Sequence, residues 1–152
     1  MGVMLTELAE EFIVEAEKKS LALHLHIPKK EQFIVTADAG KIRQVLSNLL
    51  DNALKYTPKG EVNVYLEKDD VHGVVLVKVK DSGIGLSPDD IHHLFGKFTR
   101  GSGGQKENTD GSGLGLYVAK KMLEAHRGTI WVDSEGSGKG STFVIQLLAE
   151  EQ

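Results

Sequence analysis

The sequence contains no cysteine and only three prolines among its 152 residues. Without cysteine, the chain has no thiol nucleophile, no disulfide framework and no cysteine-ligated zinc site. The longest purely aliphatic run covers residues 74–77, whereas a membrane-spanning helix needs roughly 20 apolar residues. We therefore expect a cytoplasmic domain that folds without disulfide bonds and makes no contact with a membrane.

A large excess of one charge is also lacking. Eighteen Lys and Arg stand against 22 Asp and Glu, which gives a formal net charge of -4. A nucleic-acid-binding protein needs a basic surface for its phosphate contacts, so this class is not expected. Hydrophobic residues make up 40% of the chain and charged residues 26%, as in ordinary folded domains. On folding, a chain of this length buries about two-thirds of the surface that it exposes when unfolded, which is enough for one core. We therefore expect one domain over residues 1–152.

The hydrophobic pattern predicts alternating helices and strands. Helical periodicity or helix-start signals cover residues 3–19, 39–56, 88–94 and 114–126. Alternating or β-branched runs, typical of strands, cover residues 21–27, 33–36, 62–66, 74–79, 129–134 and 141–148. Three main helices and a mixed sheet of five or six strands predict a two-layer α/β sandwich.

Glycine is unusually frequent, with 17 positions that gather mainly at 83 and 85, 101–104, 111–115 and 136–140. Glycine lets the backbone come close to a ligand, as phosphate cradles require, although hairpin turns use it equally. The segment Asp-Ser-Gly-Ile-Gly-Leu at 81–86 follows a predicted strand, and Gly-Ser-Gly-Leu-Gly-Leu at 111–116 opens a predicted helix. Free backbone N–H groups at a helix start favour phosphate.

Two common phosphate-binding motifs do not fit these glycines. A P-loop would need Ser or Thr after Lys139, where the chain has Gly140. Rossmann spacing would need glycine at 116 or at 88, where the chain has Leu116 and Pro88. Both folds are therefore disfavoured.

The predicted helix 39–56 carries polar residues beside its apolar stripe. At about 100° per residue, Asn48, Asn52 and Lys55 fall within a band of roughly 60° along one edge. Asparagine is unfavourable inside a helix, so two of them here suggest either a ligand site or a hydrogen-bond network at the edge of the core.

The order of these segments resembles that of the catalytic, ATP-binding domain of bacterial sensor histidine kinases. Residues 48–57 resemble the N box of that family, 81–86 the G1 box, 95–100 the F box, 111–116 the G2 box and 140–143 the closing strand. The resemblance extends over residues 3–148. It implies the Bergerat ATP-binding fold, which gyrase, mismatch-repair and heat-shock-chaperone ATPases share.

The resemblance also implies roles for individual residues. Asp81 would accept a hydrogen bond from the adenine amino group, Gly83 and Gly85 would let the backbone approach the base, and Ile84 would lie against its face. Asn52 would give an oxygen to Mg²⁺. The other implied nucleotide contacts are Asn48, Lys55, Tyr56, Leu86, Phe98, Arg100, Gly111, Ser112, Gly113, Leu114, Gly115, Leu116 and Thr142. Catalytic roles fall to Arg100, Lys97 and Asn48, and residues 100–112 would form the ATP lid.

Two departures from the family pattern define the expected reaction. Where hydrolytic relatives have a glutamate base, the chain has Asn48, and an amide cannot accept the proton of water or serine. None of the six histidines is followed by an acidic residue, as the phosphoacceptor of the family is. The chain should therefore lack the phosphoacceptor and sensor domains and deliver the γ-phosphoryl group to a histidine on a dimerisation domain of the same or a partner kinase. A response regulator would be an indirect partner.

Two alternatives remain open at this stage. One is a serine kinase of the anti-sigma type, which Asn48 disfavours. The other is a non-catalytic switch in which bound ATP changes the lid conformation and so controls a partner. The nucleotide-binding residues would be the same in all three cases, so phosphoryl transfer to a supplied histidine domain decides between them.

Overall fold

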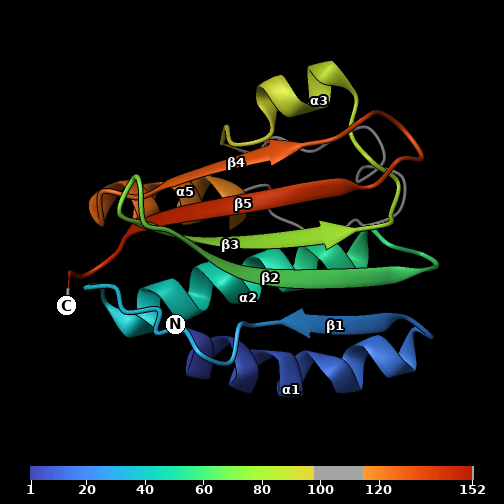
Figure 1. Cartoon of the computed structure of the whole chain (residues 1–152). Helices are drawn as coiled ribbons and strands as arrows, with labels where there is room; N and C mark the ends of the chain where they lie inside the picture. The colour runs from blue at the N-terminus through green and yellow to red at the C-terminus, as the bar shows by residue number, and fades with distance from the viewer. Residues whose placement is uncertain (98–114, 152) are drawn as a thin grey trace.

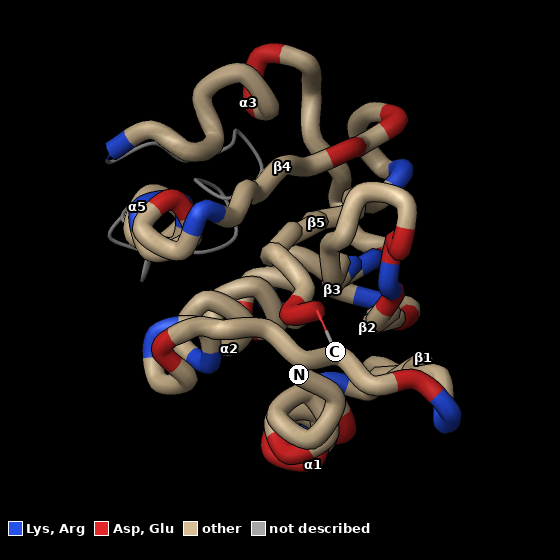
Figure 2. Tube along the Cα trace, turned by 60° about the vertical axis from the view of Figure 1, so that its left-hand side comes forward, with Lys and Arg blue, Asp and Glu red and all other residues tan. Residues whose placement is uncertain are grey.

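A computed structural model describes residues 1–97 and 115–151 and shows one mixed sheet with helices packed on one face (Figure 1). The strands are β1 Ala22–His26, β2 Glu61–Asp69, β3 Val74–Asp81, β4 Thr129–Asp133 and β5 Ser141–Leu148. The helices are α1 Gly2–Lys18, α2 Ala39–Lys55, α3 Pro88–His93 and α5 Gly115–Ala125. Seen from the side, α1, α2 and α5 form a layer beside the sheet (Figure 2). The expected two-layer α/β sandwich is confirmed.

The sheet has the strand order β1-β2-β3-β5-β4. β1 pairs with β2 in parallel, and all the other pairs are antiparallel. The parallel pair follows from α2, which carries the chain from the end of β1 back to the start of β2. The strands predicted at 62–66 and 74–79 pair as the antiparallel hairpin β2–β3, and those predicted at 129–134 and 141–148 pair as β4–β5.

The predicted strand at 33–36 is wrong, because this segment is not in a strand of the described structure. The Phe33 side chain is only 5% exposed, and its carbonyl accepts a hydrogen bond of 2.9 Å from the N-terminal ammonium group of Met1. The Ile34 carbonyl accepts the backbone N–H of Glu150. The apolar pattern of residues 33–36 therefore reflects the burial of Phe33. The segment makes single backbone hydrogen bonds and does not pair with a strand of the sheet.

Helix α2 is the element that positions the polar edge found in the sequence. The Asp38 carboxylate caps it by accepting the N–H of Lys41 at 3.0 Å. The buried face of α2 packs against the sheet and consists of Ile42, Val45, Leu46, Leu49, Leu50, Ala53 and Leu54. Burial of this face fixes the rotation of the helix. Asn48, Asn52 and Lys55 consequently lie half-exposed at the margin of the core.

Helix α5 runs antiparallel to α2. Near its end, the Nε2 atom of His126 accepts the backbone N–H of Asp38 at 3.1 Å, and at its start Gly115 lies next to Asn48. The predicted helix at 88–94 also exists as α3, where Ser87 and Asp90 form a capping box. Within residues 1–97 and 115–151, no helix has the length and apolarity that crossing a bilayer requires.

Candidate functional site

The Asp81 carboxylate is the one buried charged group among residues 1–97 and 115–151. It lies at the end of β3 and is only 6% exposed. Its Oδ1 atom accepts the N–H groups of Gly83 at 2.9 Å and of Ser141 at 3.3 Å, and its Oδ2 atom accepts the Ser141 hydroxyl at 2.8 Å. Burial raises the pKa of Asp81, and these three donors partly oppose that rise. Oδ2 has one partner, so it retains a lone pair for a ligand.

The loop after Asp81 is tied to two other segments. The N–H of Ile84 donates to the carbonyl of Tyr56 at 3.0 Å, and the Ile84 carbonyl accepts the N–H of Gly138 at 2.7 Å. The N–H of Leu86 donates to the Ser134 hydroxyl at 3.0 Å. The loop therefore joins the end of α2 to the turn between β4 and β5, and hydrogen bonds connect these three segments into one unit.

Contacts within the chain itself require the glycines of this unit. A Cβ atom on Gly83 would lie 2.1 Å from the carbonyl oxygen of Tyr56. Gly85 has a φ of +70°, and its Cβ would lie 2.1 Å from the carbonyl oxygen of Gly136. Close approach of backbone to backbone therefore requires both glycines before any ligand is considered. For residues 136–140, the hairpin-turn alternative holds, because they connect the antiparallel strands β4 and β5.

The polar edge of α2 faces the start of α5. The Asn48 amide nitrogen donates to the carbonyl oxygen of Gly115 at a long 3.4 Å, and Lys55 pairs with Asp51 at 3.0 Å. The Asn52 amide makes no hydrogen bond to any other side chain or backbone group among residues 1–97 and 115–151. Asn52 thus keeps both its oxygen and its nitrogen for a ligand.

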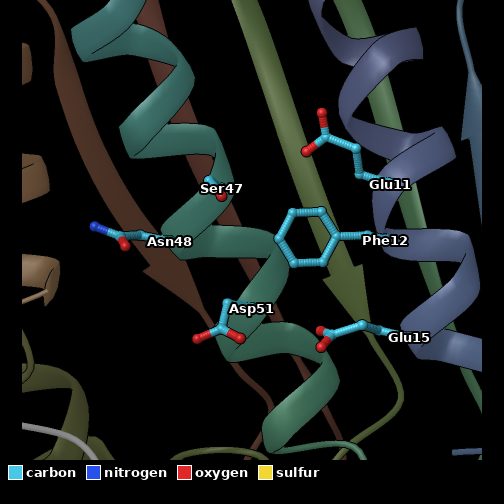
Figure 3. Close-up of a pocket in the computed structure, with 6 residues that line it drawn as sticks. All are labelled: Glu11, Phe12, Glu15, Ser47, Asn48 and Asp51. Carbon is cyan, nitrogen blue, oxygen red and sulfur yellow. The ribbon is translucent and has the colours of Figure 1, made fainter. Parts of the chain in front are cut away.

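A groove of about 450 Å³ lies between α1 and α2 (Figure 3). It is lined by Glu11, Phe12, Glu15, Ser47, Asn48 and Asp51. Asp81 is not among the lining residues, and three carboxylates at the wall would repel a triphosphate. The Asn48 side chain points away from the groove (Figure 3). We conclude that this groove is a separate surface feature and not the nucleotide site.

Several predicted residues lie elsewhere or outside the described residues. Phe98, Arg100, Gly111, Ser112, Gly113 and Leu114 fall in the range 98–114, which is not described. Gly115 and Leu116 open α5. The Lys97 ammonium lies 5.1 Å from the centroid of the Tyr117 ring, a cation–π contact.

Thr142 is not placed beside Asp81. In the β3–β5 ladder Asp81 pairs with Ser141, whereas Thr142 pairs with exposed Lys80. Because neighbouring strand residues point to opposite faces, the Thr142 side chain is directed away from Asp81. Ser141 makes the contact to Asp81, and the period-two alternation of β5 was the sequence signal that could have found it.

Thr57 is a second residue that sequence reasoning left out of the site. It follows the end of α2, it is 1% exposed, and its hydroxyl has no hydrogen-bond partner among the described residues. Its position within the segment 48–57 was the only signal. A fixed acceptor at Asp81 and an uncommitted hydroxyl at Thr57 fit a ligand edge that carries both a donor and an acceptor, as the 6-amino edge of adenine does.

Comparison with known proteins identifies the family of this chain. Residues 37–151 match the family described as "Histidine kinase-, DNA gyrase B-, and HSP90-like ATPase". The sensor histidine kinase WalK of Bacillus subtilis (strain 168) is 37% identical over 129 residues, which are 84% of this chain and 21% of WalK. The sensor protein SrrB of Staphylococcus aureus (strain MRSA252) is 31% identical over 151 residues, 99% of this chain and 25% of SrrB. The chain thus spans only a quarter or less of these relatives.

Two solved structures with the same fold are compared with this chain. The nucleotide-free catalytic domain of histidine kinase ThkA has a TM-score of 0.83 at 26% identity and covers 98% of this chain and 92% of that one. Full-length ShkA in complex with AMPPNP has a TM-score of 0.82 at 29% identity and covers 97% of this chain and 30% of ShkA. On these grounds the chain belongs to the histidine kinase-, DNA gyrase B- and HSP90-like ATPase family, as an ATP-binding catalytic domain of the sensor histidine kinase type.

Proposed function

We propose that this domain binds Mg-ATP and transfers the γ-phosphoryl group to a histidine on a separate dimerisation domain of the same or a partner kinase. The observation that carries the proposal is the buried Asp81 carboxylate, held by Gly83 and Ser141 with a lone pair left on Oδ2. An ATP-binding family and a fixed acceptor for an amino group support the same ligand. Since ATP is supplied in the cytoplasm, we place the domain there, with a response regulator as an indirect partner.

Asp81 would select adenine at the base end of the site. An ionised carboxylate only accepts hydrogen bonds, so it attracts the 6-amino group of adenine and repels the carbonyl oxygen that guanine carries at that place. Ile84, half-exposed in the loop after Asp81, would pack on the face of the base. Burial of Asp81 strengthens this preference for adenine over guanine, because electrostatic interactions are stronger in a low-dielectric site than in water.

The edge of α2 would hold the phosphate end. Lys55 and Tyr56 would contact phosphate or ribose, and Asn48 would lie near the transferred group, since it contacts the start of α5. Asn52 fits a magnesium ligand because its amide has no partner among the described residues, and Mg²⁺ uses few protein ligands beside phosphates and water. When bound, the ion would neutralise phosphate charge. Arg100 and Lys97 would supply further positive charge at the γ-phosphoryl group.

Asn48 makes a histidine a better acceptor than a serine. Attack by a serine hydroxyl requires a base to take its proton, and the Asn48 amide cannot do so. A neutral imidazole has a free lone pair on one ring nitrogen and attacks without prior loss of a proton. Catalysis by this chain then rests on placement of the two reactants and on charge stabilisation.

The direct test supplies the purified chain with labelled Mg-ATP, with and without a dimeric helical domain that carries a histidine followed by Glu or Asp. We expect no self-labelling, because none of the histidines here has that context, and slow labelling of the added domain, because the two are not tethered. The label should be lost in acid, as expected of a phosphorus–nitrogen bond. If several such acceptor domains stay unlabelled while ATP binding is normal, the domain is a nucleotide switch.

The magnesium role of Asn52 gives a second prediction. Asn52→Ala should weaken Mg-ATP binding by roughly tenfold or more, since a contact to a charged group is lost, while metal-free ADP should bind almost unchanged. Calorimetry with both nucleotides measures the difference. Asn63→Ala, which removes an amide from the opposite face of the sheet, is the matched control. Equal losses for both nucleotides would assign Asn52 a structural role.

A further inference from the structure

His126 lies directly after the end of α5, and both nitrogen atoms of its ring have a backbone partner. The Nδ1 atom lies 2.6 Å from the carbonyl oxygen of Met122, one helical turn back. The Nε2 atom lies 3.1 Å from the backbone nitrogen of Asp38. A carbonyl only accepts and a backbone N–H only donates, so Nδ1 carries the proton and Nε2 presents its lone pair. The two contacts therefore assign one neutral tautomer to His126.

The Asp38 N–H belongs to the N-cap residue of α2. In a capping box, the side chain of the third helical residue accepts the N–H of the N-cap residue. The third residue of α2 is Lys41, whose ammonium group can only donate. His126 therefore supplies, from the end of α5, the acceptor that α2 lacks in its own sequence.

The apolar contacts of α5 leave its position along α2 loosely defined. Of the 11 residues of α5, Ala119 and Leu123 are buried, and they lie four residues apart on one face of the helix. The hydrophobic effect has no direction, whereas a hydrogen bond requires a set distance and angle. The hydrogen bond between Asp38 and His126 therefore sets how far α5 extends along α2.

The opposite end of α5 lies at the polar edge of α2. Gly115 opens α5, and its carbonyl oxygen accepts the Asn48 amide N–H at 3.4 Å, near the upper limit for a hydrogen bond. A helix of 11 residues is about 16 Å long, and a displacement of one end along the axis moves the other end equally. A small displacement at His126 would therefore be enough to break the contact at Asn48.

We infer that His126 is a positioning residue for phosphoryl transfer. Its unprotonated Nε2 atom holds the end of α5 at the N-cap of α2, and this contact keeps Gly115 beside Asn48 at the phosphate end of the site. The inference rests on the proposed function. His126 itself touches neither ATP nor the acceptor histidine, and it acts through the helix that it anchors.

The experiment compares two substitutions that each keep one nitrogen position of the ring. In His126→Gln the side-chain oxygen can take the place of Nε2 and accept the Asp38 N–H. In His126→Asn the shorter side chain keeps a donor at the Nδ1 position and leaves Asp38 without an acceptor. With saturating Mg-ATP and a supplied histidine domain, His126→Asn should slow single-turnover transfer about three- to tenfold, the range of one hydrogen bond. His126→Gln should restore most of the rate.

The affinity for ADP separates positioning from a general loss of structure. Asp81 is bonded to Gly83 and Ser141, away from α5, so the Kd for ADP should change less than about twofold in both variants. His24→Asn, on the exposed face of β1, is the matched control and should leave the rate unchanged. Three results would overturn the inference: parental transfer by His126→Asn, equal slowing in the two variants, or a loss of ADP affinity as large as the loss of rate.

The tautomer of His126 tests the contact without any variant. In the isotope-labelled parent, the ring nitrogen signals of neutral His126 should show the proton on Nδ1 and none on Nε2. A proton on Nε2 would leave the Asp38 N–H without its acceptor, and it would overturn the inference even if neither variant folded. A parent that has the expected tautomer and transfers no phosphoryl group to any supplied domain would instead overturn the proposed function.

Discussion

Asp81→Asn should nearly abolish ATP binding and leave the fold intact. The fold should survive because an asparagine can keep all three contacts of the aspartate. Its oxygen can stay at the Oδ1 position, where it accepts the N–H groups of Gly83 and Ser141. Its NH₂ group then takes the Oδ2 position, where the Ser141 hydroxyl changes from donor to acceptor.

The same geometry prevents the asparagine from binding adenine. The reverse orientation would place NH₂ against two backbone N–H donors, so the amide is held with its NH₂ group toward the ligand. A donor then faces the donor of the 6-amino group. We expect a loss of about 3 kcal/mol, or roughly a hundredfold in Kd.

Calorimetry with ATP and a thermal melt of the nucleotide-free protein measure the two parts of this prediction. Asp133→Asn, at the exposed end of β4, removes the same charge elsewhere and should bind ATP normally. A folded Asp81→Asn variant with parental affinity would show that the base binds elsewhere.

The raised pKa of Asp81 also predicts a pH dependence. ATP binding needs the ionised carboxylate, so affinity should fall as the pH drops through that raised pKa, at a higher pH than for an ordinary aspartate. The free energy of unfolding should change in the opposite direction and rise as the pH falls. The native state binds this proton more tightly than the unfolded chain does, so protonation at low pH removes the cost of burying the charge. Both effects should be missing in Asp81→Asn.

Arg100→Ala should slow phosphoryl transfer to a supplied histidine domain by about a hundredfold or more, as expected when a cation at the transferred group is removed. The Kd for Mg-ATP should rise by a much smaller factor. Charge spreads over the γ-phosphoryl oxygens mainly in the transition state, so a group that acts there affects the rate more than the binding.

Single-turnover transfer under saturating ATP, together with calorimetry, separates the two effects. Arg127→Gln removes an exposed cation after the end of α5, the end remote from Asn48, and should change neither. If Arg100→Ala lowered affinity and rate by the same factor, Arg100 would only bind the nucleotide.

The sequence alone determined much of this protein because its signals are periodic or local. The apolar stripe of α2 placed Asn48, Asn52 and Lys55 on one edge, and the β-branched runs predicted the four strands that form the two hairpins. Asp81 stood out because a carboxylate directly after a hydrophobic strand, followed by glycines, has few structural uses.

Tertiary structure decided what depends on pairing between distant segments. Whether Ser141 or Thr142 meets Asp81 is set by the β3–β5 register, and a shift of one residue would reverse the answer. The segment 33–36 has a strand-like pattern, yet it makes only single backbone hydrogen bonds. Burial of Phe33 and strand pairing produce the same apolar pattern in a sequence, so the sequence does not distinguish them. Thr57 is distinguished only by what surrounds its hydroxyl, and that depends on how the end of α2 packs against the loop after β3.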